Sequence, residues 1–187
     1  MTAIRSSNLG WSILGLLLLW AGSCDAAGLK LPGSPIESPD RKWQIDSQEP
    51  AVGDDSHRLV LIDKSNGSTT ILDRFPRHAE VLWSPDSERV AITDYYGSDQ
   101  SDCRAMRRSG ADSTSIRKAI RGTRFANLVE GNHHAYVGCR RWITPSTLEF
   151  EISAYGDANP KGVTSRGTFD VAAAKIVGTA SARPPAK

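Results

Sequence analysis

The stretch from His78 to Gly97, HAEVLWSPDSERVAITDYYG, constrains the fold more than any other part of this chain. Apolar residues stand at every second position on both sides of its centre: Ala79, Val81 and Trp83 before it, and Val90 and Ile92 after it. Side chains alternate between the two faces of a strand, so each run can bury one face. Pro85 favours a turn, and Ser84 and Asp86 can bond nearby backbone amides. The stretch therefore predicts two strands joined by a Pro-Asp turn.

Turns of this kind recur at three places: Ser38-Pro39-Asp40, Ser84-Pro85-Asp86 and Thr144-Pro145-Ser146. They are 46 and 60 residues apart, and each has a tryptophan within three residues: Trp43, Trp83 and Trp142. A short alternating strand and a further strand pair follow each turn. Four short strands repeated at such a period predict propeller-blade units, which bury their faces only against neighbouring units.

The segment LWSPDSERVAITD resembles the core motif of the WD-like propeller repeats of the Tol-system periplasmic propeller and of prolyl-oligopeptidase propellers. The first copy, at Pro39 and Asp40, matches that motif more loosely. The third copy keeps Trp142 and Pro145 but lacks the Asp. The resemblance covers about residues 39–178 and implies a propeller-type fold. It implies little about function, because propellers host many unrelated activities.

Only three such units are found in this chain, whereas closed propellers typically have about 4–8 blades. We therefore expect a mainly β protein, an antiparallel meander of about three blade-like units merged into one twisted sheet or sandwich. One short helix is expected within 112–121, with Asp112 or Ser113 as its cap and Gly122 just past its end. The alternative is an open array completed by a partner, which would expose large apolar flanks.

Local patterns place further strands and loops. Asn66-Gly67 between two apolar runs predicts a hairpin. Residues 148–152 alternate apolar and acidic side chains and predict a half-buried strand. Asn159-Pro160-Lys161-Gly162 predicts a loop. The expected β domain spans residues 38–179, followed by a frayed tail at 180–187.

The N-terminus has the pattern expected of an export signal. Arg5 precedes an apolar run over residues 11–21 that is shorter than the ~20 residues needed to span a bilayer. Residues 1–23 are therefore expected to be a signal peptide. Ala21-Gly22-Ser23-Cys24 resembles the lipobox of bacterial lipoproteins, in which the cysteine becomes lipidated, although that pattern prefers Leu where Ala21 stands. Cleavage after Ala26 is the alternative. Residues 24–37, rich in Gly, Pro and Ser, are expected to be a linker or tether.

Three cysteines are present: Cys24, Cys103 and Cys139. An odd count in an exported protein leaves one cysteine unpaired. If Cys24 carries lipid, Cys103 and Cys139 are expected to form a disulfide in the oxidising compartment. Two buried thiols are the alternative.

The sequence predicts no catalytic residue, metal ligand or cofactor site. His133 and His134 are adjacent, so on a strand they point to opposite faces and do not hold one metal. Asp94, Asp99 and Asp102 lack the spacing of a calcium loop. No nucleophile elbow and no phosphate-cradling glycine motif is present.

Charge is unevenly distributed along the chain. Residues 37–63 carry seven acidic and three basic side chains, and residues 103–141 carry nine basic and two acidic ones. Such asymmetry marks either a surface for an anionic partner or a solvated face. No nucleic acid is expected as a partner.

Three functions fit these observations. The first is a non-enzymatic, exported cell-envelope protein, periplasmic or lipid-anchored to the membrane, that binds another envelope protein or an anionic surface polymer. The second is a small periplasmic hydrolase-like enzyme that uses His134 and loop carboxylates. The third is a structural lipoprotein without a specific ligand.

Overall fold

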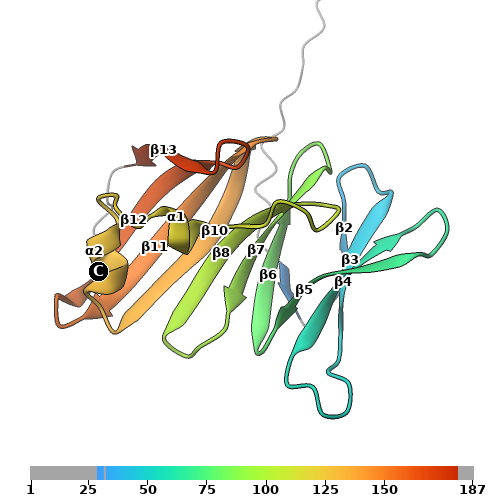
Figure 1. The fold of residues 1–187 in the computed structure, drawn as a ribbon, viewed down its shortest axis with the longest axis horizontal. Helices are drawn as coiled ribbons and strands as arrows, with labels where there is room; N and C mark the ends of the chain where they lie inside the picture. Colours follow the sequence, from blue (N-terminus) through green and yellow to red (C-terminus); the bar gives the residue numbers. More distant parts are fainter. Residues whose placement is uncertain (1–28, 32, 181–187) are drawn as a thin grey trace, which may run out of the picture.

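The computed structural model describes residues 29–31 and 33–180 (Figure 1). Three successive four-stranded units make up the fold. The first unit consists of β2 (Ile36–Glu37), β3 (Trp43–Gln48), β4 (His57–Asp63) and β5 (Thr69–Phe75). The second consists of β6 (His78–Trp83), β7 (Arg89–Tyr95), β8 (Gln100–Arg107) and β9 (Thr114–Ser115). The third consists of β10 (His134–Thr144), β11 (Thr147–Gly156), β12 (Asn159–Asp170) and β13 (Lys175–Ala180).

These strands form two sheets. The first unit is a four-stranded sheet of its own. The second and third units share a nine-stranded sheet in the order β1-β6-β7-β8-β10-β11-β12-β13, with β9 beside β8 and β1 (Leu29–Leu31) at the edge. Pairing is antiparallel except between β8 and β10, where only two residue pairs join the units. The mainly β, antiparallel meander of three units is thus confirmed, and neither sheet closes on itself.

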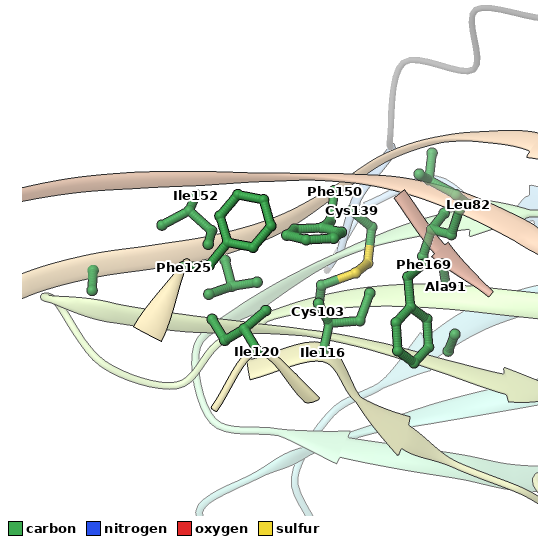
Figure 2. Close-up of a cluster of buried hydrophobic side chains, with 14 of the residues drawn as sticks. Leu82, Ala91, Cys103, Ile116, Ile120, Phe125, Cys139, Phe150, Ile152 and Phe169 are labelled. Carbon is green, nitrogen blue, oxygen red and sulfur yellow. A yellow bond between two sulfur atoms is a disulfide. The ribbon is translucent and has the colours of Figure 1, made fainter. Parts of the chain in front are cut away.

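The second unit lies between the other two, and the period-two pattern of its strands explains this position. One face packs on the first unit through a cluster that includes Ala79, Val81, Trp83, Ile45, Leu59 and Phe75. The opposite face packs on the third unit through a cluster that includes Leu82, Ala91, Phe150, Ile152 and Phe169 (Figure 2). Both faces of β6 and β7 are therefore buried, as in the middle repeat of a stacked array.

The outer face of the third unit is polar. Its buried residues alternate with outward side chains that are at least partly exposed and mostly polar or aromatic: His134, Tyr136, Arg140, Glu149, Glu151, Ser153, Tyr155, Thr164 and Arg166. Ile143 and Val177 are the exposed aliphatic side chains among the described residues of this unit. Terminal repeats of an array need a polar outer face to remain soluble. The third unit therefore caps the stack.

The first two Pro-Asp turns have the same hydrogen-bond pattern. The Ser38 hydroxyl donates to Asp40 Oδ1 at 2.5 Å, and the Ser84 hydroxyl donates to Asp86 Oδ1 at 2.6 Å. Each serine oxygen also accepts from the first backbone amide of the following strand, at 3.0 Å in the first turn and 2.8 Å in the second. The equivalence supports the repeat inferred from the sequence.

The three turns lie side by side at one end of the array. The backbone N–H of Asp40 donates to Ser87 Oγ at 3.1 Å, which joins the first two turns. Arg89 Nη1 donates to the Pro145 carbonyl at 3.3 Å, which joins the second turn to the third. The third turn is tighter, and Thr144 Oγ1 accepts from the two backbone amides that follow Pro145. It keeps the position of the other turns without their Ser-Asp pair.

Two tryptophans bond each unit to the one before it. Trp83 Nε1 donates to the Ile36 carbonyl of the first unit, and Trp142 Nε1 donates to the Leu82 carbonyl of the second, both at 3.3 Å. Trp83 is buried as expected, whereas Trp142 is only partly buried. Trp43 differs, because it follows its turn instead of preceding it, and the Arg108 guanidinium lies 4.3 Å from its ring centroid.

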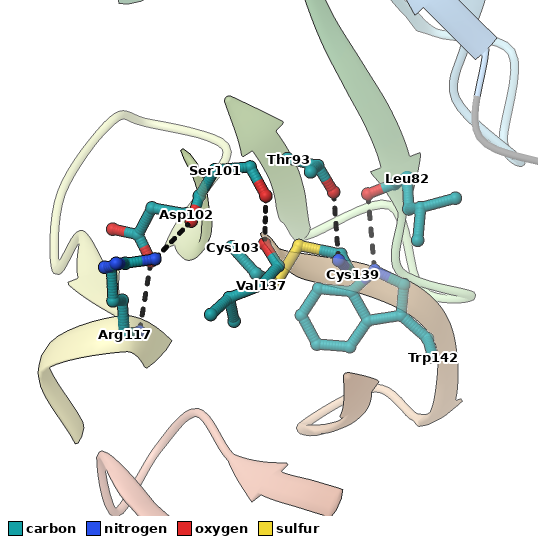
Figure 3. The surroundings of a disulfide bond; sticks show 9 residues. All are labelled: Leu82, Thr93, Ser101, Asp102, Cys103, Arg117, Val137, Cys139 and Trp142. Carbon is teal, nitrogen blue, oxygen red and sulfur yellow. Dashed lines mark hydrogen bonds between the residues drawn. A yellow bond between two sulfur atoms is a disulfide. The ribbon is translucent and has the colours of Figure 1, made fainter. Parts of the chain in front are cut away.

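The disulfide joins Cys103 on β8 to Cys139 on β10, with the Cα atoms 5.3 Å apart (Figure 3). This is the pairing that the cysteine count predicts. Cys139 N also donates to Thr93 Oγ1 at 2.9 Å, and Ser101 Oγ donates to the Val137 carbonyl at 3.2 Å. Together these bonds hold the junction between the second and third units.

Several expectations need correction. The expected linker, residues 24–37, contains two strands, β1 and β2. β1 pairs with β6 and covers an edge of the nine-stranded sheet that would otherwise be unpaired, and β2 pairs with β3. Instead of one helix there are two, α1 (Ile116–Ala119), capped by Ser115, and α2 (Ala126–Glu130). The expected loop at 159–162 belongs to β12, which extends the β11 hairpin.

The expected signal peptide, Cys24 and nearly all of the tail lie outside the described residues. No helix in the described ranges is long and apolar enough to cross a membrane.

Candidate functional site

A stacked His–Tyr pair occupies equivalent positions in the second and third units. His78, the first residue of β6, lies opposite Tyr95, the last residue of β7. His134, the first residue of β10, lies opposite Tyr155 near the end of β11. The ring centroids are 4.1 Å apart in both pairs, and the rings are nearly parallel, at 17° and 9°. Because cross-strand partners share a face of the sheet, each histidine supports one side of its tyrosine ring.

The sequence carries a signal for these pairs that alignment on the Pro-containing turns misses. The residues HAEV at the start of β6 recur as HAYV at the start of β10. Each copy is followed, after one turn, by a strand with Tyr as its last or next-to-last residue. The offset between the two histidines differs from the offset between the turns because β10 is longer than β6 and contains a β-bulge. Comparison of strand starts, in place of turns, would have found the pairs.

The aromatic ring of Tyr155 is accessible for stacking by a ligand. One side of its ring lies against His134, and the residue is 44% exposed. On the neighbouring strand the adjacent residue is Gly162, where a Cβ would lie only 4.0 Å from that of Tyr155. The absence of a side chain at this glycine leaves the ring accessible from that side.

Tyr136 connects the two pairs. Its ring centroid is 6.5 Å from that of Tyr155, and its hydroxyl donates to the Ser98 carbonyl at 2.7 Å. Partial burial and the hydroxyl of Tyr155 raise the pKa of Tyr136, and the nearby Arg77 guanidinium opposes this rise. Arg77 immediately precedes His78 of the second unit.

Tyr95 brings the second unit close to the charged side chains of the third. Burial raises the pKa of Tyr95 to about 12, and the carboxylate of Glu80 adds to this rise. Arg140 and Glu151 on the third unit also act on this hydroxyl, in opposite directions. We call the combined region the His–Tyr surface and define it by His78, Tyr95, His134, Tyr136, Tyr155, Arg77, Arg140, Glu151 and Arg166.

The two adjacent histidines have different partners. His133 Nε2 lies 3.1 Å from Asp157 Oδ2, and both side chains are exposed. His134 stacks on Tyr155 instead, and no hydrogen bond or ion pair joins it to a carboxylate among the described residues. The arrangement expected for a hydrolase, His134 with two loop carboxylates, is therefore not assembled there.

Asp94 and Asp102 lie on strands β7 and β8 instead of in a loop, and Asp94 joins Asp73 of β5 in binding Arg104. Asp73 Oδ2 and Asp94 Oδ2 both lie 2.8 Å from Arg104 Nη2, although only the Asp94 contact is aligned as a hydrogen bond. Burial raises the pKa of Asp94 to about 6 and also raises that of Asp73. Asp102 accepts from the backbone N–H of Arg117 at 3.1 Å. Within the described ranges no three His, Cys, Asp or Glu side chains gather as a metal site.

Comparison with known proteins gives a fold and no family. No family model matches the chain, and no curated protein sequence matches it. An oligogalacturonate lyase in complex with manganese is similar in structure, with a TM-score of 0.52 and 14% identity over 81% of this chain and 42% of that one. The fold is β-propeller-like. An acylaminoacyl peptidase from Pyrococcus horikoshii gives a TM-score of 0.49 and 9% identity over 82% of this chain and 25% of that one. The chain therefore spans less than half the length of either protein.

Proposed function

We propose that this protein is a non-enzymatic, exported cell-envelope protein whose His–Tyr surface binds an extended surface polymer. The observation that carries the proposal is the repetition of one stacked His–Tyr pair at equivalent positions of two neighbouring units. His78 and Tyr95 share the sheet face of Leu82 and Ala91, which packs on the third unit, whereas His134 and Tyr155 lie on the outer face of the third unit. A ligand with a repeating chemical unit would therefore have to pass over the strand ends of the third unit to contact both pairs. Two linked weak contacts bind far more tightly than either alone, because the second contact is intramolecular.

The composition of the surface favours a glycan over a protein as the ligand. The cores of stable protein interfaces are about 65% apolar. Two aliphatic side chains of the third unit are well exposed, Ile143 at 49% and Val177 at 50%. The other exposed side chains of β10, β11 and β12 are mainly hydroxyls, carboxylates and guanidinium groups around aromatic rings. The C–H face of a sugar ring packs on an aromatic ring, while its hydroxyls take hydrogen bonds from polar neighbours.

The described residues do not assemble the histidine and carboxylates that the enzyme hypothesis requires. A general base must lie within hydrogen-bond reach of the group it serves and needs a partner to orient it. His134 is held by ring stacking, and the carboxylates of Asp73 and Asp94 face Arg104. The oligogalacturonate lyase is an enzyme, but at 14% identity its similarity informs the fold alone.

Binding of purified protein to a panel of soluble polysaccharides and peptidoglycan fragments, measured by calorimetry, tests the proposal. Tyr155→Ala and Tyr95→Ala should each weaken binding by about tenfold, because each removes one aromatic contact. Longer oligosaccharides should bind more tightly than single repeat units. Tyr96→Ala is the matched control, since Tyr96 is similarly exposed (40%) but lies outside the His–Tyr surface. Unchanged affinity in both tyrosine variants, or binding only to proteins, would refute the proposal.

The cellular location is part of the same proposal, in which Cys24 is the lipid attachment site. Several acyl chains on one N-terminus anchor a protein stably, whereas a single chain does so only marginally. Cys24→Ser should abolish both the incorporation of labelled palmitate and the membrane fractionation of the protein. Absence of label in the wild type would leave only a cleaved secretory signal.

A further inference from the structure

We infer that the polymer bound by the His–Tyr surface is acidic and that Arg140 binds its anionic group. This inference rests on the proposed function and names the chemistry of the ligand.

Arg140 is the arginine on this face that forms only a long ion pair and no hydrogen bond with a described residue. Arg166 Nε donates to Glu151 Oε2 at 2.7 Å, and Arg141 Nε donates to Glu149 Oε2 at 2.9 Å. Arg140 Nε lies 3.9 Å from Glu151 Oε2, beyond hydrogen-bond distance, and its side chain is 50% exposed. Arg140 makes no hydrogen bond to any described residue, so its fork of donors remains open to a planar oxyanion.

The backbone also directs Arg140 to this position. In the pairing of β10 with β11, Cys139 lies opposite Phe150 and Arg141 lies opposite Glu149, so Arg140 is the extra residue of a β-bulge. Bulges re-aim side chains and are common beside functional sites. The preceding residue, Cys139, is fixed by the disulfide and by its bond to Thr93 (Figure 3). The guanidinium group therefore projects from a rigid point.

The location of Arg140 relative to the aromatic rings suits an acidic glycan. Arg140 acts electrostatically on Tyr95 of the second unit while it belongs to the third unit. Arg77, which forms no ion pair within the described ranges, lies near Tyr136 and adds a second cation. Arg140 lies beside Glu151, and Tyr155 lies four residues further along the same strand, β11. A polymer that follows β11 from Tyr155 would thus bring an acidic substituent to the Arg140 guanidinium group.

A carboxylate and a phosphate diester both present the required oxyanion. The probes are alginate oligosaccharides, the same oligosaccharides with their carboxyl groups reduced to alcohols, and poly(glycerol phosphate). The inference is supported if the wild type binds either anionic polymer at least about tenfold more tightly than it binds the neutral glycan. The Arg140→Gln variant should likewise bind that anionic polymer at least about tenfold more weakly than the wild type does. The polymer that binds identifies the source of the oxyanion. Arg140→Lys should restore only part of the affinity, because lysine lacks the bidentate fork.

Arg121→Gln is the matched control, an exposed arginine beside α1, and it should bind like the wild type. Rising salt should weaken binding less in Arg140→Gln than in the wild type. Equal binding of the carboxyl-reduced glycan, or no effect of Arg140→Gln where Tyr155→Ala weakens binding, would overturn the inference and leave the proposed function standing. Failure of all glycans to bind would overturn both.

Discussion

Loss of the Cys103–Cys139 disulfide should lower the free energy of unfolding by about 4 kcal/mol. The two cysteines are 36 residues apart in sequence. In the chain-entropy description, opening a loop of that length restores about 4 kcal/mol of freedom to the unfolded chain at 25 °C. The bridge lies where only two residue pairs join β8 to β10, so few backbone bonds duplicate its role.

Urea unfolding at neutral pH, followed by tryptophan fluorescence and by circular dichroism, measures this effect. Cys103→Ala, Cys139→Ala and the double variant should have similar midpoints, because each loses the same covalent link. The urea dependence of the unfolding free energy should be steeper than in the wild type, since an uncrosslinked chain exposes more surface.

A double variant within about 1 kcal/mol of the wild type would refute this reasoning. The junction of the second and third units would then be held mainly by the buried cluster and by the hydrogen bonds that cross it. Single variants far less stable than the double variant would instead point to damage from an isolated buried thiol. That result would also contradict the loop-entropy explanation.

Three further changes test the packing and electrostatics. Trp83→Ala should cost about 3–5 kcal/mol in urea unfolding, and Trp142→Ala should cost less because Trp142 is only partly buried; equal costs would contradict this. Gly167→Ala should destabilise by about 1–3 kcal/mol, since its Cβ would lie 2.5 Å from Phe150 Cζ, and an unchanged melting temperature would disprove that contact. The pKa of Asp94, about 6, lies above the ordinary value of 3.8 for an aspartate, so the folded state binds the proton more tightly than the unfolded state. The free energy of unfolding should therefore rise as the pH falls from about 7 to about 5. In Asp94→Asn it should change less over the same range. Urea midpoints measured at several pH values would show both effects.

The strands and turns could be predicted because their signals are local. The alternation of apolar residues before and after Pro85, and again at 148–152, depends only on the period of two along a strand. The hairpin at Asn66-Gly67 likewise depends on which residues tolerate a tight turn, and Gly67 has a φ of 73°. The disulfide partners followed from counting cysteines, without knowledge of any distance.

The candidate site was not predicted because it is built from long-range pairings. His134 meets Tyr155 only through the register of β10 with β11, and a shift by one residue would place the two rings on opposite faces. The sequence patterns of β1 and of residues 159–162 resembled those of a linker and a loop, and pairing with neighbouring strands made them part of the sheets. Composition describes such segments in isolation, whereas their backbone partners lie far away in the chain.

By itself the sequence determined three strand-rich units, their Pro-containing turns and the pair of cysteines that could bond. The tertiary structure alone decided that the second unit is buried on both faces, that the third presents a polar cap, and that Arg140 projects from a bulge toward the second unit. The physical reason is that burial and register are set by which sheet faces meet. Alternation within a strand predicts that one face of the strand is buried. Only the packing of the sheets decides which other face covers it.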